Sequence, residues 1–198
     1  DLHKAIRRQR QMCIRDSSRS QESCFLLTNG LGGYASLTAA YSANRCDQGV
    51  LIAAQKAPGE RVTLVHRLRE TLTVDGKPYW LSTQQFADGT QPEDGFRNLS
   101  FFAFENIPHW RYHIGGVRVT RTMAMTYGQN TTAVIYKVEN QSNAVCSLTV
   151  DPFVKFGPKE TAIKAAPNIS FSQGKVMGDK YTLHISTTAA LRETPVCS

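Results

Sequence analysis

VTLVHRLRETLTV, residues 62–74, followed at once by Asp75-Gly76, is the stretch that decides the fold. Apolar side chains occupy most of its even positions and polar side chains most of its odd ones, which is the two-residue period of a half-buried strand. The Asp-Gly pair favours a two-residue hairpin turn, because both central residues of that turn take positive φ. We therefore expect residues 79–81, Tyr-Trp-Leu, to form the returning strand.

The same alternation recurs along the rest of the chain. It is found, with turn signals between the stretches, in residues 110–114, 117–125, 132–138, 145–150 and 181–186. Gly115-Gly116, between the first two of these stretches, predicts a second two-residue hairpin turn. Only residues 159–166 and 189–193 have a locally helical composition, and both stretches are short. Long alternating strands joined by turns predict an all-β protein, built as an antiparallel β-sandwich of the supersandwich type.

Composition narrows the class of protein. The chain has 198 residues, of which 41% are hydrophobic and 20% charged, as in an ordinary single globular domain. No apolar stretch approaches the roughly 20 residues needed to cross a bilayer, so no membrane is predicted as a partner. The five cysteines show no metal-ligand spacing, and their odd number argues against a disulfide framework. Without a secretory signal in the first 20 residues, we expect a cytoplasmic protein. No motif predicts a metal site or a cofactor site, so we expect neither a metal nor a cofactor.

The first 20 residues differ from the remainder of the chain. They hold six of the 23 Lys and Arg residues, although the net charge of the whole chain is only +7. Residues 12–17, Met-Cys-Ile-Arg-Asp-Ser, resemble the translation of the transposase end sequence used in sequencing-library adaptors. Residues 1–20 are thus interpreted as a non-native or disordered basic head, a sequencing artefact, and residues 21–198 as the domain. The remaining charge is scattered, which argues against a nucleic-acid partner.

Three glycines in four positions mark residues 28–36, TNGLGGYAS. Glycine permits turns and close approaches of the backbone that bulkier residues forbid. The stretch does not fit a phosphate loop, since it has neither Gly-Lys-Ser/Thr nor the GxGxxG spacing. Two interpretations stay open on these residues alone, a β-turn between two strands and a loop that contacts a ligand.

These residues carry a resemblance to a known family. Residues 28–36 resemble the opening motif of the N-terminal domain of bacterial and archaeal type glycogen debranching enzymes, the amylo-α-1,6-glucosidases. Residues 43–54, ANRCDQGVLIAA, are similar to that family's Asn-Thr-Arg-Arg-Tyr-His-Gly-Leu-Leu-Val-Ala-Ala segment. The resemblance continues, in the family's order, through residues 68–76, 110–112 and 130–132, and spans residues 22–155. It departs at Cys46-Asp47-Gln48, where the family has Arg-Tyr-His, and beyond Pro152.

The resemblance implies a fragment of a two-domain enzyme. In that family an N-terminal β-sandwich packs against a C-terminal (α/α) barrel, where two carboxylates hydrolyse the α-1,6 links of branched, glycogen-like glucans. The chain is too short to contain the barrel, so we expect a non-catalytic domain that supports the barrel and contacts the glucan. The alternatives are a stand-alone carbohydrate-binding β-sandwich module and a generic interaction domain. A face left uncovered by the barrel predicts poor solubility for the isolated chain.

No catalytic residue and no metal ligand is predicted within the chain. The carboxylates of Glu22, Glu70, Asp94, Glu105 and Asp151 form no recognisable pair and are expected to be solvated or to form turns. Although a tryptophan within a strand usually packs in the core, Trp110 follows Pro108-His109 near a strand start and is expected to be partly exposed. The residues predicted to contact the glucan or the missing domain are Asn29, Gly30, Gly32, Gly33, Tyr34, Arg45, Asp47, Gln48 and Trp110.

Overall fold

A computed structural model describes residues 10–12, 23–56, 59–85, 92–159, 161, 168–178 and 180–192. Most of the predicted head, residues 1–20, lies outside these residues, so its interpretation stays a prediction. Within the head, the backbone of β1 (Arg10–Met12) pairs antiparallel with a strand of the main body. The boundary of the domain at residue 21 likewise stays a prediction.

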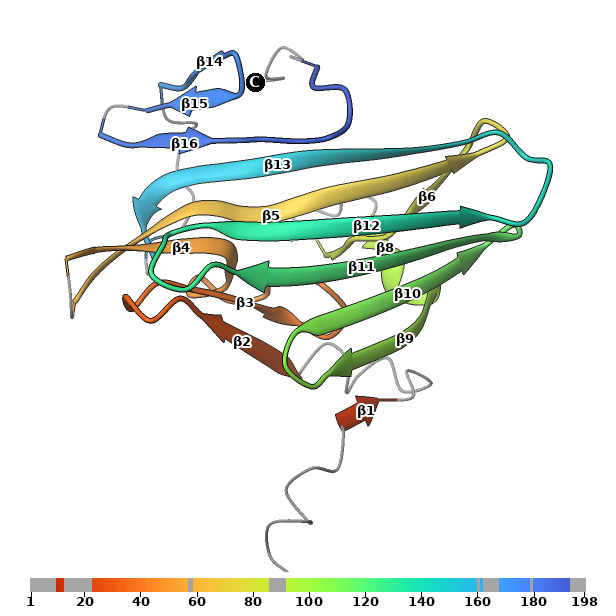
Figure 1. Ribbon diagram of the computed structural model, residues 1–198, viewed down its shortest axis with the longest axis horizontal. Helices are drawn as coiled ribbons and strands as arrows, with labels where there is room; N and C mark the ends of the chain where they lie inside the picture. The colour runs from red at the N-terminus through yellow and green to blue at the C-terminus, as the bar shows by residue number, and fades with distance from the viewer. Residues whose placement is uncertain are drawn as a thin grey trace, which may run out of the picture.

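Two antiparallel sheets form the body of the molecule (Figure 1). Sheet A has the strand order β1-β9-β10-β11-β12, with β9 (Leu99–Phe104), β10 (Pro108–Ile114), β11 (Val117–Met125) and β12 (Thr132–Asn140). Sheet B has the order β13-β5-β4-β3-β2, with β2 (Cys24–Thr28), β3 (Tyr34–Thr38), β4 (Gly49–Lys56), β5 (Glu60–Val74) and β13 (Cys146–Pro158). β6 (Lys77–Trp80) pairs with β5 at the end of sheet B. The predicted all-β antiparallel sandwich is confirmed, and the sheets do not close into a barrel.

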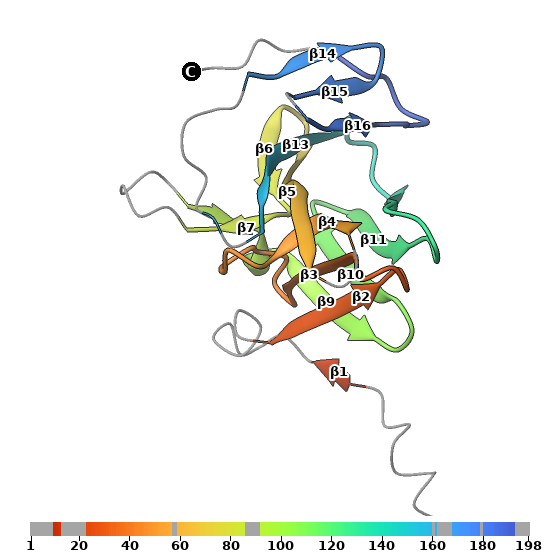
Figure 2. The same cartoon turned by 90° about the vertical axis from the view of Figure 1, so that its left-hand side faces the viewer.

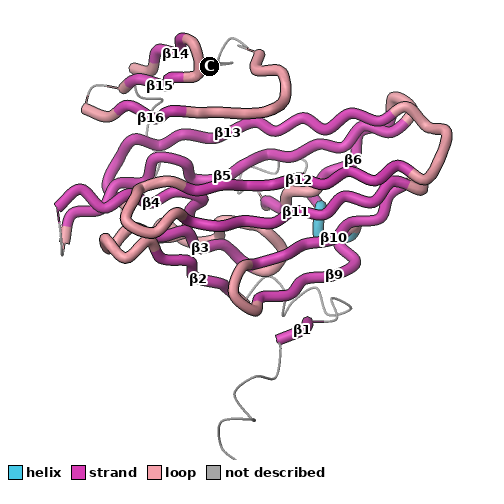
Figure 3. Tube along the Cα trace, in the orientation of Figure 1, coloured by secondary structure: helices cyan, strands magenta, loops and turns pink. Residues whose placement is uncertain are grey.

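Smaller elements flank the two sheets. β14 (Ser170–Ser172), β15 (Lys175–Met177) and β16 (Thr182–His184) form a three-stranded sheet beside β13, on the side of the molecule opposite β1 (Figure 2). β7 (Thr83–Gln84) pairs with β8 (Glu93–Asp94), which leads into the single 3-10 turn Gly95–Arg97 of the described part. No helix forms over residues 189–192, so that helical expectation is wrong, and the tube of Figure 3 shows this stretch as loop. Of residues 159–166, only 159 and 161 are described.

The two hairpins expected from the sequence are present. Asp75 and Gly76 take φ angles of 47° and 78° between β5 and β6, and Gly115 and Gly116 take 54° and 79° between β10 and β11. Positive φ at both central residues gives these turns the right-handed twist of the strands that they join. The turn chemistry thus sets the register of both pairs.

The core lies between sheets A and B, where inward-facing side chains of both sheets meet. On β11, every second residue from Val117 to Met123 is buried, and the residues between them are half-buried. Val176 and Leu183 of the small sheet join the same hydrophobic cluster. The rings of Phe156 on β13 and Tyr181 lie 6.5 Å apart, centre to centre. The small sheet therefore packs on the sandwich as part of its core.

Candidate functional site

The glycine motif ties one sheet to the other. Residues 29–33, the glycine loop, connect β2 to β3 in sheet B. Asn29 is fully buried, and its Nδ2 donates to the Gln129 carbonyl at 2.9 Å and to Asn130 Oδ1 at 3.0 Å. The Gly128 amide donates back to the Asn29 carbonyl at 2.7 Å. Since residues 128–130 form the turn between β11 and β12 of sheet A, these bonds join the two sheets at one end of the sandwich.

Asn130 extends this connection to β4. Its Nδ2 donates to the Ala54 carbonyl at 2.9 Å, and its Oδ1 accepts from the Ala54 amide at 3.0 Å. The side-chain amide thus satisfies a β4 residue on both of its backbone groups, as a neighbouring strand would. Thr132 adds a third bond, because its hydroxyl donates to the Val50 carbonyl at 2.9 Å. Each of these partly buried backbone groups would cost free energy if it were left without a partner.

Two positions of the glycine loop require glycine, because neighbouring side chains lie too close to leave room for a Cβ. A Cβ at Gly33 would lie 2.6 Å from Asn29 Nδ2 and 2.7 Å from Asn130 Oδ1. A Cβ at Gly30, which has a φ of 78°, would lie 2.5 Å from the ring of Tyr127. Such distances are shorter than real Cβ atoms tolerate, so these positions serve the packing of the loop. The geometry therefore favours the turn interpretation over the ligand interpretation for Gly30 and Gly33.

Four predicted site residues line one surface depression of about 400 Å³, the β3 depression. It is lined by Leu26, Thr28, Gly32, Gly33, Tyr34, Ser36, Asp47, Arg61 and Lys159. The Tyr34 hydroxyl donates to the Asp47 carbonyl at 2.8 Å, which holds the half-buried ring in place. Arg61 Nε donates to the Gly32 carbonyl at 2.6 Å, and its guanidinium lies 5.9 Å from the centre of the Tyr34 ring.

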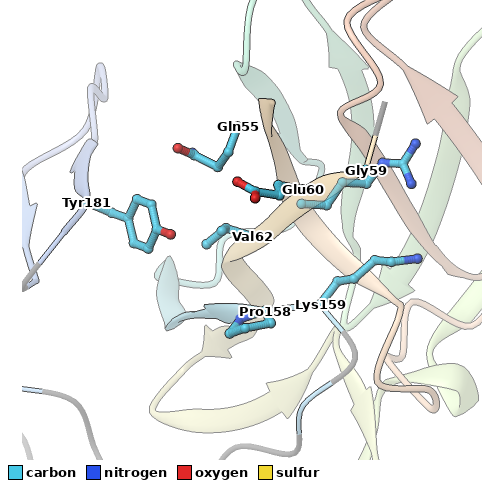
Figure 4. Close-up of a pocket in the computed structure, with 8 residues that line it drawn as sticks. Gln55, Gly59, Glu60, Val62, Pro158, Lys159 and Tyr181 are labelled. Carbon is cyan, nitrogen blue, oxygen red and sulfur yellow. The ribbon is translucent and has the colours of Figure 1, made fainter. Parts of the chain in front are cut away.

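A second depression of about 290 Å³, the β5 depression, adjoins the first (Figure 4). It is lined by Gln55, Gly59, Glu60, Arg61, Val62, Pro158, Lys159 and Tyr181. Arg61 and Lys159 line both depressions. Figure 4 shows Tyr181 on one side of this depression and Glu60 on the other. Sequence reasoning missed the residues of the β5 depression, because strands distant in the sequence bring them together.

The segment that departs from the family pattern forms a closed turn. Gln48 is buried, and its Oε1 accepts from the amides of Asn44 at 2.6 Å and Arg45 at 3.1 Å. Its Nε2 lies 3.0 Å from Cys24 Sγ on β2. Arg45 and the Asp47 side chain are exposed. Gln48 therefore shapes the turn that presents Asp47 to the β3 depression, and Arg45 lies outside that depression.

The exposure predicted for Trp110 is wrong. Its side chain is fully buried, and its Nε1 donates to the Ala39 carbonyl at 2.8 Å. The rings of Phe25 and Tyr41 meet it edge-on, with centres 5.3 and 5.2 Å away. The two-residue period of β10 points Trp110 inward, and this outweighs the nearby strand start. In this position the ring is covered by protein and offers no face to a ligand.

A buried polar cluster was missed by sequence reasoning. Glu70 of β5 is completely buried, so its expected solvation is wrong, and it forms an ion pair with the equally buried Arg121 of β11. The Tyr136 hydroxyl donates to Glu70, and Arg121 donates to the Tyr112 hydroxyl at 2.6 Å. The Arg121 guanidinium also lies over the Tyr41 ring at 3.3 Å. We call these five residues the core polar cluster, which connects the two sheets through the middle of the sandwich.

Burial and pairing oppose each other in this cluster. Burial raises the pKa of Glu70, and the Arg121 guanidinium and the Tyr136 hydroxyl act against that shift. Burial alone would lower the pKa of Arg121, but Glu70 and Tyr112 outweigh it and hold the pKa above its usual value. Arg121 is therefore a permanent buried cation. Such a charge is tolerated only where it is paired and hydrogen-bonded.

Two further carboxylates from the sequence analysis, Asp94 and Asp151, pair with arginines. Asp151 pairs with Arg69 at 2.9 Å and Asp94 with Arg97 at 3.1 Å, both at the half-exposed surface. Glu22 lies outside the described residues. Within the described ranges, no group of three or more His, Cys, Asp or Glu residues could hold a metal ion. The same residues include no helix long and apolar enough to cross a membrane.

Exposed apolar side chains gather beside the glycine loop. Leu31 is 46% exposed and Tyr127 is 85% exposed. Both belong to the segments that the Asn29 bonds hold together, since Tyr127 lies against Gly30. We call Leu31 and Tyr127 the loop tip. Most of the Tyr127 ring is therefore open to solvent.

Comparison with known proteins identifies the family. No curated protein and no solved structure gives a significant match to this chain. The family described as glycogen debranching enzyme N terminal matches residues 24–196, which cover sheet B, the strands of sheet A other than β1, and the small third sheet. The glycine motif, the Gln48 turn and the core polar cluster all lie within the matched residues. The chain therefore belongs to the glycogen debranching enzyme N-terminal family.

Proposed function

We propose that this chain is the non-catalytic N-terminal domain of an enzyme that hydrolyses the α-1,6 branch points of glycogen-like glucans. The hydrolysis itself belongs, in this proposal, to an (α/α) barrel domain of the parent protein. The observation that carries the proposal is the family match over residues 24–196. The glycine loop supports a scaffolding role, because Asn29 and Gly33 are taken up by bonds and contacts between the sheets.

The loop tip is the proposed contact with the barrel. Leu31 and Tyr127 are exposed, yet both are held on turns that the Asn29 bonds fix in place. A rigid apolar projection binds with little loss of conformational freedom. Arg45 is an exposed hydrogen-bond donor on a turn that Gln48 closes, and we propose that it contacts the same partner.

A branched α-glucan is the proposed substrate, and a cytoplasmic location is part of the proposal. Substrate contact by this domain is assigned to Gly32, Tyr34 and Asp47, which line the β3 depression. The depression offers an aromatic ring, a guanidinium and a carboxylate, groups that suit a polyhydroxylated ligand.

The experiment is to recover the complete gene and assay its product on branched α-glucan. We expect glucose to be released from branch points, and we expect the release to vanish when the part encoding the barrel is deleted. A complete product that folds but leaves branch points intact would overturn the proposal.

The docking role has its own measurement, the oligomeric state of the isolated chain. We expect self-association in sedimentation velocity, because the loop tip is uncovered. The paired variant Leu31→Ser with Tyr127→Ser should reduce that association. A chain that stays a monodisperse monomer at high concentration would count against docking at the loop tip.

A stand-alone carbohydrate-binding module is the second candidate. The two adjoining depressions with a tyrosine on each favour it, since such a module needs no barrel. This candidate predicts an open reading frame that ends with this domain and a product that binds glucan but cleaves nothing. An (α/α) barrel encoded downstream in the same frame would rule it out.

A further inference from the structure

The two depressions share a wall. Arg61 and Lys159 line both of them, so the two depressions adjoin at these side chains, and we call the pair the outer groove. Tyr34 lies in the β3 depression and Tyr181 in the β5 depression. The outer groove is therefore bounded by a tyrosine in each half, with two cationic side chains between them.

The walls of the outer groove are held by the fold. Arg61 is anchored by its bond to the Gly32 carbonyl, and the Lys159 amide donates to the Arg61 carbonyl at 3.4 Å. Tyr181 packs on Phe156, and its carbonyl accepts from the Gly178 amide at 2.9 Å. All the aromatic and cationic groups thus sit on strands or tied turns. A groove prepared in this way loses little entropy when a ligand binds.

The charges of the outer groove are balanced. Glu60 and Asp47 place carboxylates at the two halves, beside the cations Arg61 and Lys159. A site for a polyanion would gather cations alone, because each phosphate or carboxylate of the ligand needs a counter-charge. A mixture of donors and acceptors instead matches hydroxyl groups, each of which donates one bond and accepts others.

We propose that the outer groove binds an unbranched α-1,4-linked stretch of glucan, with sugar faces on Tyr34 and Tyr181 and hydroxyl groups on Arg61 and Lys159. The ring of a tyrosine gives an apolar surface with a polar end, which suits the apolar face of a pyranose. The two volumes, about 400 and 290 Å³, together fall in the range of sites for ligands of several rings. The choice of glucan rests on the proposed function, whereas the groove itself rests on the geometry.

The outer groove has a direction relative to the proposed docking site. Gly32 and Gly33 line it, and Leu31 of the loop tip lies in the same loop. A glucan chain lying from Tyr181 to Tyr34 would thus point toward the loop tip. In the parent enzyme, the groove would then hold a glucan chain whose end points toward the barrel.

The test measures binding by this chain alone, with maltoheptaose as the probe in isothermal titration calorimetry. We expect binding that weakens about tenfold or more in Tyr34→Val and in Tyr181→Ala, the loss of roughly one well-packed ring contact. Lys159→Ala tests the middle of the groove without altering either ring. The matched control is Ile135→Ala, which removes an exposed apolar side chain of β12, outside the groove and the loop tip, and should leave the affinity unchanged. Cellohexaose, whose β-1,4 links give a straight chain, should not bind.

The outcomes separate the groove from the proposed function. Loss of maltoheptaose binding in Tyr34→Val and Lys159→Ala, with urea midpoints near that of the unaltered chain, supports the groove. No binding by the unaltered chain, or equal binding by all variants, overturns it even if the complete gene product releases glucose from branch points. If the groove variants lose binding but the complete product leaves branch points intact, the groove stands and the debranching proposal fails.

Discussion

Two arginine sites in this molecule use the same kinds of side chain and differ in where they lie. In the core polar cluster, Arg121 is fully buried, pairs with Glu70 and lies over the Tyr41 ring. In the outer groove, Arg61 is half-buried, donates to a backbone carbonyl and lies over the Tyr34 ring, 5.9 Å from its centre. One site joins two sheets, and the other leaves its donors at the surface.

The difference shows how burial decides what an arginine does. Arg121 is surrounded by Glu70 and tyrosines, so its charge is already matched by the protein. Arg61 has Gly32 as its bonded partner and keeps part of its guanidinium at solvent. A buried cation is thus fixed as a structural element, whereas a half-exposed one can exchange water for ligand hydroxyls.

The largest expected effect comes from breaking the buried pair. Arg121→Met leaves the Glu70 carboxylate buried without its cation and should lower the free energy of unfolding by about 3–5 kcal/mol. Urea denaturation measures this loss. The paired variant Arg121→Met with Glu70→Leu removes both charges and should be clearly more stable than Arg121→Met alone. If the single variant loses less than about 1 kcal/mol, the value of an exposed pair, the cluster does not hold the sheets together.

The glycine loop gives the next largest effect. Gly33→Ala would push a Cβ against Asn29 Nδ2 and Asn130 Oδ1, and we expect a loss of about 1–3 kcal/mol in urea denaturation. Gly59→Ala is the matched control, because no atom lies within 4 Å of its Cβ. That control should stay within about 0.5 kcal/mol of the unaltered chain. Equal losses in the two variants would contradict the tie between the sheets.

An exposed ion pair provides the comparison for the buried pair of Arg121 and Glu70. Arg69 and Asp151 are opposite each other on β5 and β13, and their side chains are 41% and 38% exposed. Asp151→Asn should therefore cost only about 0.2–1 kcal/mol. Salt should reduce the difference further, because exposed charges are screened. A loss as large as that of Arg121→Met would show that burial does not decide how much an ion pair contributes to stability.

The smallest expected effect is a pH dependence at His66. Burial lowers the pKa of this histidine from its usual 6.5, with help from the charges of Lys155 and Arg67. The unfolded chain then binds more protons than the folded chain, so stability should decrease as the pH falls through 6.5. Urea midpoints at pH 7.5 and 5.5 measure the decrease, and His66→Gln should flatten it. An unchanged slope in His66→Gln would assign the pH dependence to other groups.

The alternation of apolar and polar residues predicted most of the fold, and it also contains a signal for the core polar cluster. The hairpin turns at Asp75-Gly76 and Gly115-Gly116 were predicted correctly, because the conformation of a two-residue turn depends on its own two residues. The same alternation that buries Leu72 also points Glu70 inward, and the alternation of β11 points Arg121 inward. Two inward charges of opposite sign, one on each sheet, are thus the feature of the sequence from which the core polar cluster could be predicted.

The sequence by itself determined the all-β class, the two hairpin turns and the family, because these depend on local periods, turn residues and motifs. Only the tertiary structure decided that Trp110 is covered, that Asn29 joins sheet B to sheet A, and that Tyr34 and Tyr181 flank one groove. The hydrogen bonds of Trp110 to Ala39 and of Asn29 to Gln129 join residues 71 and 100 positions apart. Such contacts are fixed by how the sheets stack, and the period of a single strand carries no record of its partner across the core.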